Sequence, residues 1–370
     1  MKMAGVKQSR VRLRGEEIRR YILEHVDAHP REVAAFAAGK FGVSRQAINK
    51  HLQRLAKEGA LGEKGKTRNR VYSLAPLSEW QTNFAIGPDL EEHLAWQDQV
   101  SLALGPMPEN VLDIWQYGFT EIINNARDHS GGSEIVVLLR KTAVTAEMAI
   151  CDNGVGIFKK IQMAMSLLDE RHAIFELAKG KLTTDPKHHT GEGIFFTSRM
   201  VDSFNIFSGG VAFMHDFGDS EDWIFERKDP SAGTVVYLKL NNHTARTTTK
   251  IFDKYTMGED FGFNKTVVPV RLAQYGNDKL ISRSQAKRVL ARVELFKTVI
   301  FDFKEVPIIG QAFADEIFRV FAKEHREIQI EHMHANSAVK RMIDRALSAN
   351  PEAEVESAQL SLIPPVSGDH

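Results

Sequence analysis

The chain has 370 residues, of which 43% are hydrophobic and 26% charged, with a formal net charge of zero; this composition is typical of a folded protein of about two to four domains. No apolar run approaches the length of a membrane span, and the N-terminus lacks a signal-peptide pattern, so we expect a cytoplasmic protein with no membrane partner. The single cysteine, Cys151, cannot form an internal disulfide and is expected as a buried strand residue.

The first 75 residues are strongly basic. They hold 17 Lys+Arg and 7 Asp+Glu, which leaves ten excess negative charges on the rest of the chain and points to a polyanionic partner. Their pattern predicts a helix over 15–29 that Pro30 ends, a second helix over 31–39, and a third helix capped by Ser44 that runs to about residue 58. A basic hairpin with a strand at 71–74 follows. This is the element order of a winged helix.

Residues 1–75 therefore resemble the winged helix-turn-helix domains of bacterial regulators, which implies double-stranded DNA as the partner. The third helix keeps polar side chains off its apolar face that suit base edges and phosphates, namely Arg45, Gln46, Asn49, Lys50 and Arg54. On the hairpin, the DNA backbone would be bound by Lys64, Lys66, Arg68 and Arg70. A winged helix used for protein contacts is the alternative, and the charge surplus favours DNA. Such regulators often pair to read two half-sites, and a homodimer is left open.

A polar helix is the central feature of the next segment. After an expected linker at 76–87, one helix is predicted from Asp89 to about residue 104 and another from about Glu109. In the second helix the spacing places four polar residues on one arc, Glu121, Asn125, Asp128 and His129, beside an apolar arc of Phe119, Ile122, Ile123 and Ala126. Strands are predicted at 134–140 and 146–151. The polar arc suits a metal-bound anionic ligand, with a solvated helix face as the alternative.

Two glycine motifs follow this helix. The second strand ends in Asp152-Asn153-Gly154-Val155-Gly156, where the backbone can turn closely around a flat ligand and the carboxylate can accept an N–H, as from an adenine amino group. The run Thr190-Gly191-Glu192-Gly193-Ile194 opens a predicted helix, and exposed N–H groups at a helix N-terminus bind phosphates. Later, Gly233-Thr234 leads into a strand at 235–240.

The order of these motifs over residues 88–242 resembles the GHKL ATPase family, which includes gyrase-type topoisomerases, heat-shock chaperones, histidine kinases and anti-sigma-factor kinases. The resemblance implies a Bergerat-type α/β sandwich that binds ATP and Mg²⁺, with residues 158–190 as the ATP lid. By position, Asn125 would ligate Mg²⁺, Glu121 would act as general base, and Asp152 would bind the adenine amino group with support from Thr234. Asp128 matches the gyrase-like helix and His129 the anti-sigma kinase helix, so the pair does not select a subfamily. The other implied cofactor-binding residues are Gly154, Gly156, Thr190, Gly191, Gly193 and Ile194.

Within the lid, Lys187, His188 and His189 would either meet phosphate or belong to a solvated loop.

The C-terminal part shows an α/β alternation. After an expected linker at 243–265, strands are predicted at 266–272, 298–303 and 327–332 and helices at 282–295, 311–324 and 338–347, with a disordered tail at 350–370. The run 299–310 followed by a helix resembles STAS-type domains, the fold of anti-sigma-factor antagonists, which implies a regulatory protein partner for residues 266–349. Where those antagonists carry a phosphorylated serine, this chain reads Gly310-Gln311-Ala312, so phosphorylation by its own ATPase domain is not expected.

These segments together predict a multidomain α+β and α/β protein with a winged helix, a Bergerat-type domain and a STAS-like domain. The function expected from them is a transcriptional regulator in which Mg·ATP binding and slow hydrolysis switch the conformation. The alternative is a protein kinase of the anti-sigma type that uses Glu121 and Asn125 to phosphorylate a serine or histidine on a partner.

Overall fold

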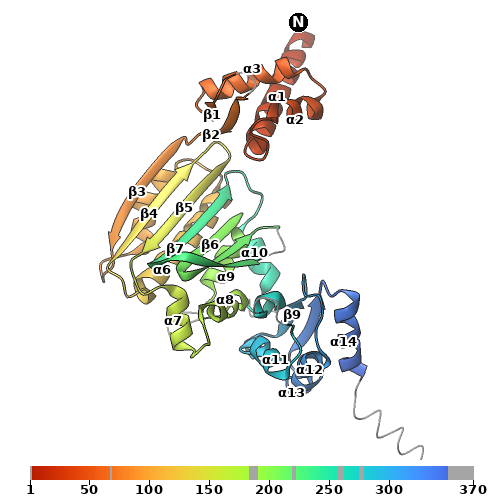
Figure 1. Cartoon of the computed structure of the whole chain (residues 1–370). Coiled ribbons are helices and arrows are strands. Elements are labelled where there is room, and N and C mark those ends of the chain that lie inside the picture. Colours follow the sequence, from red (N-terminus) through yellow and green to blue (C-terminus); the bar gives the residue numbers. More distant parts are fainter. Residues whose placement is uncertain are drawn as a thin grey trace, which may run out of the picture. The chain divides into compact units, whose positions relative to one another are not determined.

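The computed structural model describes residues 2–66, 69–182, 191–218, 222–256, 262–274 and 279–348, with side chains from residue 13 onward (Figure 1). Contacts divide the chain into two compact units. The first comprises Met1–Ile157, Thr197–Phe217 and Asp229–Thr248, and the second comprises Phe158–Phe196, Gly218–Lys228 and Thr249–His370. Arg68, Thr190, the Lys187–His189 run and the predicted tail lie outside the described residues. No helix in the described ranges combines the length and the apolarity that a membrane crossing requires.

The N-terminal segment folds as three helices and a two-stranded antiparallel hairpin, which are α1 (Lys2–His25), α2 (Val33–Phe41), α3 (Arg45–Lys57), β1 (Leu61–Lys64) and β2 (Val71–Leu74). Gly42 ends α2 in the left-handed conformation with φ 62°, and the Ser44 side chain caps α3 by accepting the amide of Ala47. The apolar faces of the helices meet in one core that includes Ile22, Val33 and Leu52. The predicted order of elements is therefore observed, with α1 longer than expected.

A five-stranded sheet of order β3-β4-β5-β7-β6 forms the centre of the first unit. Its strands are β3 (Ser78–Ala85), β4 (Glu134–Lys141), β5 (Thr145–Asp152), β6 (Ser203–Asp216) and β7 (Asp222–Asn241), and the β3–β4, β4–β5 and β5–β7 pairs are antiparallel. The helical segments are α4 (Glu92–Ala95), a π-helical stretch (Trp96–Val100), α5 (Ser101–Leu104), α6 (Glu109–His129) and α9 (Gly193–Met200). Both β7 and α9 pass from one unit into the other along the chain.

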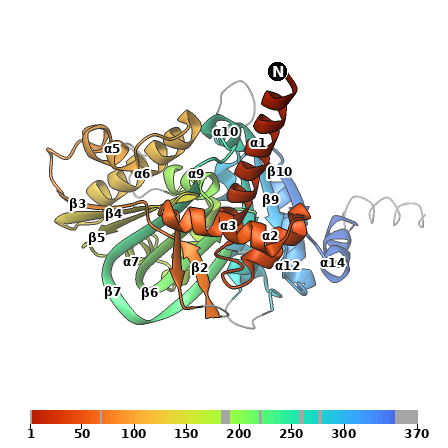
Figure 2. The same ribbon diagram turned by 90° about the horizontal axis from the view of Figure 1, so that it is seen from above.

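One face of this sheet is covered by helices. Figure 2 shows α5 and α6 on the same side of β3, β4 and β5. Alternate residues of β4 and β5, such as Ile135, Val137 and Met148, are fully buried. Leu138, whose side chain points to the opposite face of the sheet, is 41% exposed. The sheet thus buries its helix-covered side and leaves much of the other side open.

The segment 76–87, expected as a linker, is the edge strand β3. Eight residues of β3 pair with β4, from Ser78 opposite Lys141 to Ala85 opposite Glu134. Its exposed positions carry Glu79, Gln81 and Asn83, so this strand has a polar outer face that resembles a loop in composition. The linker prediction was wrong because pairing with β4 imposes a strand on a sequence with few apolar residues.

The second unit contains a three-stranded parallel sheet of order β10-β9-β8, formed by β8 (Lys265–Pro269), β9 (Thr298–Asp302) and β10 (Gln329–Met333). Its helices include α11 (Arg283–Leu290), α12 (Gln311–Asp315), a π-helical stretch (Glu316–Phe321), α13 (Ala322–Glu324) and α14 (Ser337–Ser348), with 3₁₀ turns at Val270–Ala273 and Val293–Leu295. The alternation of strand and helix agrees with the prediction.

Three further helices belong mainly to the second unit: α7 (Ile157–Ala164), α8 (Glu170–Lys179) and α10 (Thr248–Tyr255). The expected linker 243–265 therefore contains α10. Phe263 lies 4.6 Å from Phe195 and 5.2 Å from Phe296 between ring centroids, so residues before and after this supposed linker share one aromatic cluster.

Candidate functional site

Helix α6 supplies the first elements of a candidate site. Its apolar arc is buried as predicted, with Phe119, Ile122, Ile123 and Ala126 all at most 5% exposed. Glu121 and Asn125 on the neighbouring arc are half-buried. Burial of one arc fixes the rotation of the helix, and this fixes the direction in which the carboxylate and the amide project.

Asp128, near the C-terminal end of α6, lies against its neighbour Arg127. The Arg127 guanidinium donates from Nε to Asp128 Oδ1 at 2.8 Å and from Nη2 to Asp128 Oδ2 at 3.2 Å, and its Nη1 pairs with Glu92 at 3.0 Å. The Asp128 carboxylate is thus part of an ion-pair chain to the α4 segment. His129 is half-buried one residue later.

The end of α6 is joined to the loop that follows β5. The Val155 amide donates to the Ser130 carbonyl at 2.9 Å, and the Asn153 Oδ1 accepts the amides of Ser133 and Glu134 at 2.8 and 3.2 Å. A methyl group on Gly154 would lie only 2.3 Å from the Ser130 carbonyl oxygen. This close crossing requires glycine and holds the Asp152 loop beside the polar helix.

Asp152 occupies the last position of β5, opposite Thr234 of β7. One carboxylate oxygen accepts the Gly154 amide at 2.9 Å, while the Thr234 hydroxyl accepts the Ile157 amide at 3.0 Å. Burial raises the pKa of the Asp152 carboxyl above its usual value, and hydrogen bonds from Gly154 and Thr234 act in the opposite direction. Here a half-buried carboxylate retains capacity to accept a further N–H from a ligand.

A second glycine of the Asp152 loop, Gly156, also makes a close contact. Gly156 has φ 98°, and a methyl group there would lie 2.6 Å from the buried Ser208 hydroxyl, which in turn donates to the Gly233 carbonyl at 3.1 Å. A methyl group on Gly233 would meet the Asp152 carbonyl oxygen. The structure therefore brings Asp152, Gly154, Gly156 and Thr234 together at the end of α6.

We predict that Gly154→Ala lowers the free energy of unfolding by about 1–3 kcal/mol, because the added methyl group forces the Asp152 loop away from Ser130. Gly210→Ala on β6 is the matched control, since nothing lies within 4 Å of the methyl group it would add. Urea unfolding of both variants checks the prediction, and equal midpoints would show that the crossing tolerates a side chain.

The glycine motif at Gly191 and Gly193 belongs to the second unit. Gly191 has φ 71°, its carbonyl accepts the Leu182 amide at 3.1 Å, and Gly193 begins α9 with Ile194 as the next residue. Residues Thr197–Met200 of the same helix belong to the first unit. There, Thr197 Cγ2 would lie 3.1 Å from a methyl group on Gly118, so a glycine in α6 permits the close approach of α9.

The arc of α6 that carries Glu121 and Asn125 offers half-buried oxygen donors. Carboxylate and amide oxygens, as on Glu121 and Asn125, are the donors that Mg²⁺ prefers, and Mg²⁺ commonly takes one or two protein ligands together with phosphate oxygens and water. Asn124, which belongs to none of the sequence motifs, has a buried Oδ1 with no hydrogen-bond partner among the described residues. Such an acceptor is costly unless a ligand or a water meets it.

The polar face of α3 is exposed. Arg45, Gln46, Asn49, Lys50 and Arg54 all lie on the surface, as do Lys64 and Lys66 near the hairpin tip. Two cations have protein partners: Arg54 pairs with Glu58 at 2.6 Å, and Arg70 pairs across the hairpin with Glu63 at 3.0 Å. The lysines and the N-terminal half of α3 are therefore the accessible part of this surface.

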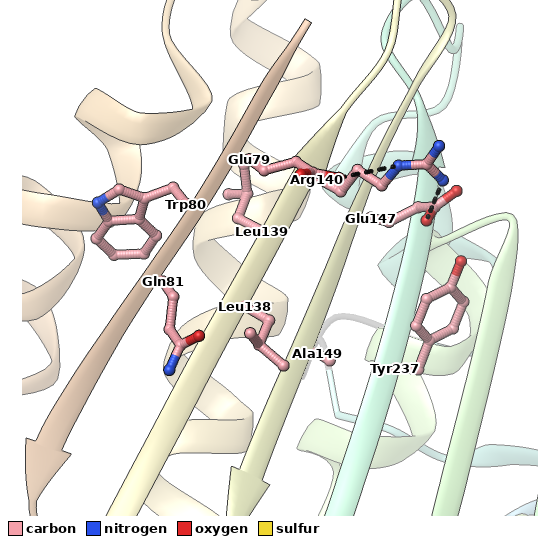
Figure 3. A pocket seen from close by; sticks show the side chains of 9 residues that line it. All are labelled: Glu79, Trp80, Gln81, Leu138, Leu139, Arg140, Glu147, Ala149 and Tyr237. Atoms are coloured by element: carbon pink, nitrogen blue, oxygen red, sulfur yellow. Dashed lines mark ion pairs between the residues drawn. The ribbon is translucent and has the colours of Figure 1, made fainter. Parts of the chain in front are cut away.

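A shallow hollow of about 480 Å³ lies on the five-stranded sheet (Figure 3), lined from four strands by Glu79, Trp80, Gln81, Leu138, Leu139, Arg140, Glu147, Ala149 and Tyr237. Arg140 pairs with Glu79 at 3.7 Å and with Glu147 at 3.6 Å. Burial, followed by the Glu147 carboxylate, raises the pKa of Tyr237. The predicted site residues do not line this hollow.

Comparison with known proteins identifies the C-terminal region. Residues 285–340 match a family model described as a STAS-like domain of unknown function (DUF4325). No curated protein matches the chain. The match contains β9, α12, α13 and β10, so the chain has a C-terminal STAS-like region built on a parallel sheet, and this part of the sequence-based prediction is confirmed.

Proposed function

We propose that the protein is an ATP-binding, DNA-binding transcriptional regulator in which a GHKL-type site controls the other modules. The observation that carries this proposal is the junction of α6 with the Asp152 loop, where a half-buried carboxylate is held by the Gly154 amide beside a helix that presents Glu121 and Asn125. A half-buried carboxylate that can accept an N–H, beside a helix with oxygen ligands for a metal, is a donor set suited to a magnesium nucleotide.

Each residue of the proposed nucleotide site would have a separate role. Asp152 would accept the adenine amino group with Thr234 beside it, and the Asn125 amide oxygen would ligate Mg²⁺. Bound Mg·ATP would supply a phosphoryl group for transfer. The Glu121 carboxylate would orient and deprotonate the attacking hydroxyl group, which belongs to water in slow hydrolysis. The GHKL resemblance also assigns phosphate contacts to the amides around Gly191 and Gly193, which belong to the second unit.

Calorimetric titration with Mg·ATP tests the nucleotide site. We expect Asn125→Ala to weaken binding by at least about tenfold, since a charge-assisted contact is worth about 1.5–3 kcal/mol. Unchanged affinity in both this variant and one at Asp152 would refute the proposal.

DNA would be bound by α3 and the hairpin, with Arg45, Gln46 and Asn49 near base edges and Lys50, Lys64 and Lys66 near phosphates. Sequencing of DNA retained by the full chain, with and without ATP, would identify the site and show whether nucleotide changes DNA affinity.

We predict that Lys64→Ala combined with Lys66→Ala weakens binding to all DNA sequences and reduces the slope of log affinity against log salt by about two, because each phosphate contact contributes about 0.9 to that slope. Fluorescence anisotropy across a salt series measures both quantities. The control removes two exposed lysines of the C-terminal region, Lys323→Ala with Lys340→Ala. A slope that the hairpin substitutions leave unchanged would exclude the hairpin from the interface.

A protein kinase is the second candidate, because Glu121 could deprotonate a partner hydroxyl as readily as water. The STAS-like region offers no target in cis at the start of α12, since a methyl group on Gly310 would lie 2.7 Å from the Ile281 Cα and the position cannot hold a serine without rearrangement. Incubation with radiolabelled ATP and candidate partners separates the two functions. Label in protein supports the kinase, and free phosphate alone supports the switch.

A further inference from the structure

The C-terminal end of α8 is bonded to the STAS-like region through three buried charged residues, Glu176, Lys179 and Arg292, which we call the clamp. Lys179 is fully buried and Glu176 is 1% exposed. Glu176 pairs with Lys179 at 2.8 Å and with Arg292 at 3.1 Å. One carboxylate thus balances two cations from segments more than a hundred residues apart.

The two cations of the clamp also cap each other's helices. Arg292, which follows α11, donates to the carbonyls of Glu176, Gly180 and Lys181 at the end of α8. Lys179, at the end of α8, donates to the carbonyls of Arg288 and Ala291 at the end of α11, at 3.3 and 2.8 Å. Carbonyls at the C-terminal end of a helix carry partial negative charge, so each cation is placed where the end of the other segment attracts positive charge.

Further contacts extend the clamp into the parallel sheet. The Thr266 hydroxyl of β8 donates to the Lys179 carbonyl at 2.7 Å, and Lys181 Nζ donates to the Leu295 carbonyl at 2.9 Å. Arg292 itself has φ 64°, a conformation that costs energy for a side chain of this size and persists only where surrounding contacts hold it. The end of α8 is therefore part of the STAS-like region's own fold.

Because of its position in the chain, α8 connects the STAS-like region to the two glycine motifs. It lies between the Asp152 loop and the Gly191 motif, in the segment that the GHKL resemblance assigns to the ATP lid. We infer that the clamp makes α8 and the STAS-like region move as one body, so that nucleotide binding is coupled to the STAS-like region and a partner of that region acts back on the nucleotide site. This inference rests on the proposed nucleotide-binding function. Coupling of this kind is reciprocal, since each site changes the affinity of the other by the same factor.

Hydrogen exchange on the full chain tests the clamp without nucleotide. In Arg292→Met we expect residues 170–182 to exchange at least tenfold faster while β8 and β9 exchange as in the wild type. Lys179→Met, which keeps the Glu176–Arg292 pair, should give a smaller increase at the same place if Arg292→Met proves too unstable. Arg319→Met is the control, because Arg319 pairs with Asp315 within the same region. Unchanged exchange in residues 170–182 would overturn the clamp.

The same measurement with saturating Mg·ATP or a non-hydrolysable analogue tests the coupling. The wild type should show altered protection in α11 on nucleotide binding, and the clamp variants should bind nucleotide by calorimetry with this change reduced at least threefold. Nucleotide binding to the wild type without any change in α11 would overturn the coupling and leave the proposed function standing. Absence of nucleotide binding to the wild type would overturn both the proposed function and the coupling.

Discussion

Replacing Asp152 by asparagine should weaken Mg·ATP binding by about 10–100-fold, the equivalent of losing one charge-assisted hydrogen bond of about 1.5–3 kcal/mol. One oxygen of Asp152 already accepts the Gly154 amide at 2.9 Å, so the carboxamide oxygen of asparagine would remain there. Its NH₂ group would then face the adenine amino group. Two donors would meet where a donor and an acceptor are needed.

The same substitution should not destabilise the protein without nucleotide. Burial raises the pKa of Asp152 in the folded state, so its contribution to stability is greatest below the unfolded pKa and is lost as the pH rises through the folded pKa. At neutral pH the charged carboxylate is a cost that asparagine lacks. We therefore expect the melting temperature of Asp152→Asn without nucleotide to equal or exceed that of the wild type.

Calorimetric titration and thermal unfolding on the same samples check both parts. Asp98→Asn, at an exposed position of the same unit, is the control for loss of one carboxylate. A variant with a lower melting temperature and normal ATP affinity would assign Asp152 a structural role only.

Segments with strong periodicity were predictable from the sequence. In α6 the apolar arc of Phe119, Ile122, Ile123 and Ala126 is buried as the spacing requires, and in the C-terminal region helix and strand patterns alternate as observed. A helix of 21 residues that packs one face on a sheet carries this signal in its own sequence. The family match at residues 285–340 supports the same conclusion for the STAS-like region.

Features that depend on distant partners were not predictable. The edge strand β3 lies between two prolines and exposes Glu79, Gln81 and Asn83, so only its pairing with β4 distinguishes it from a linker. Asn153 accepts an amide at the backbone crossing and Asn124 has a buried acceptor oxygen, and no spacing rule reveals either feature. A run of two asparagines before the helix end was the one available signal for Asn124.

Lys179 is the clearest example of a residue whose surroundings could not be predicted from the sequence. A lysine next to a glycine at a helix end indicates a solvated C-terminus, whereas here the ammonium is fully buried because Arg292 and the end of α11 supply its surroundings. Burial lowers the pKa of Lys179 to about 8, against the opposing effect of Glu176. A buried charge of this kind is retained at neutral pH only because its partner is present.

Glu176→Gln should therefore cost about 3–5 kcal/mol of the second unit's unfolding free energy, because it leaves Lys179 and Arg292 as two buried cations without a counter-charge. Lys179→Met should cost less, since the Glu176–Arg292 pair survives and a thioether of similar length fills the space. The ordering of the two variants distinguishes loss of charge balance from loss of packing.

The pH dependence sharpens this prediction. A buried lysine whose folded pKa lies below its unfolded value destabilises the protein while it is charged, and this penalty is relieved as the pH rises from the folded pKa towards the unfolded value of about 10.4. Loss of Glu176 lowers the folded pKa of Lys179 further, so the deficit of Glu176→Gln should narrow between pH 6 and pH 9. Urea unfolding monitored by hydrogen exchange in β8 and β9 measures the deficit at each pH. A deficit that is constant with pH would mean that the carboxylate contributes through shape and hydrogen bonding alone, and that Lys179 does not carry the buried charge on which the clamp depends.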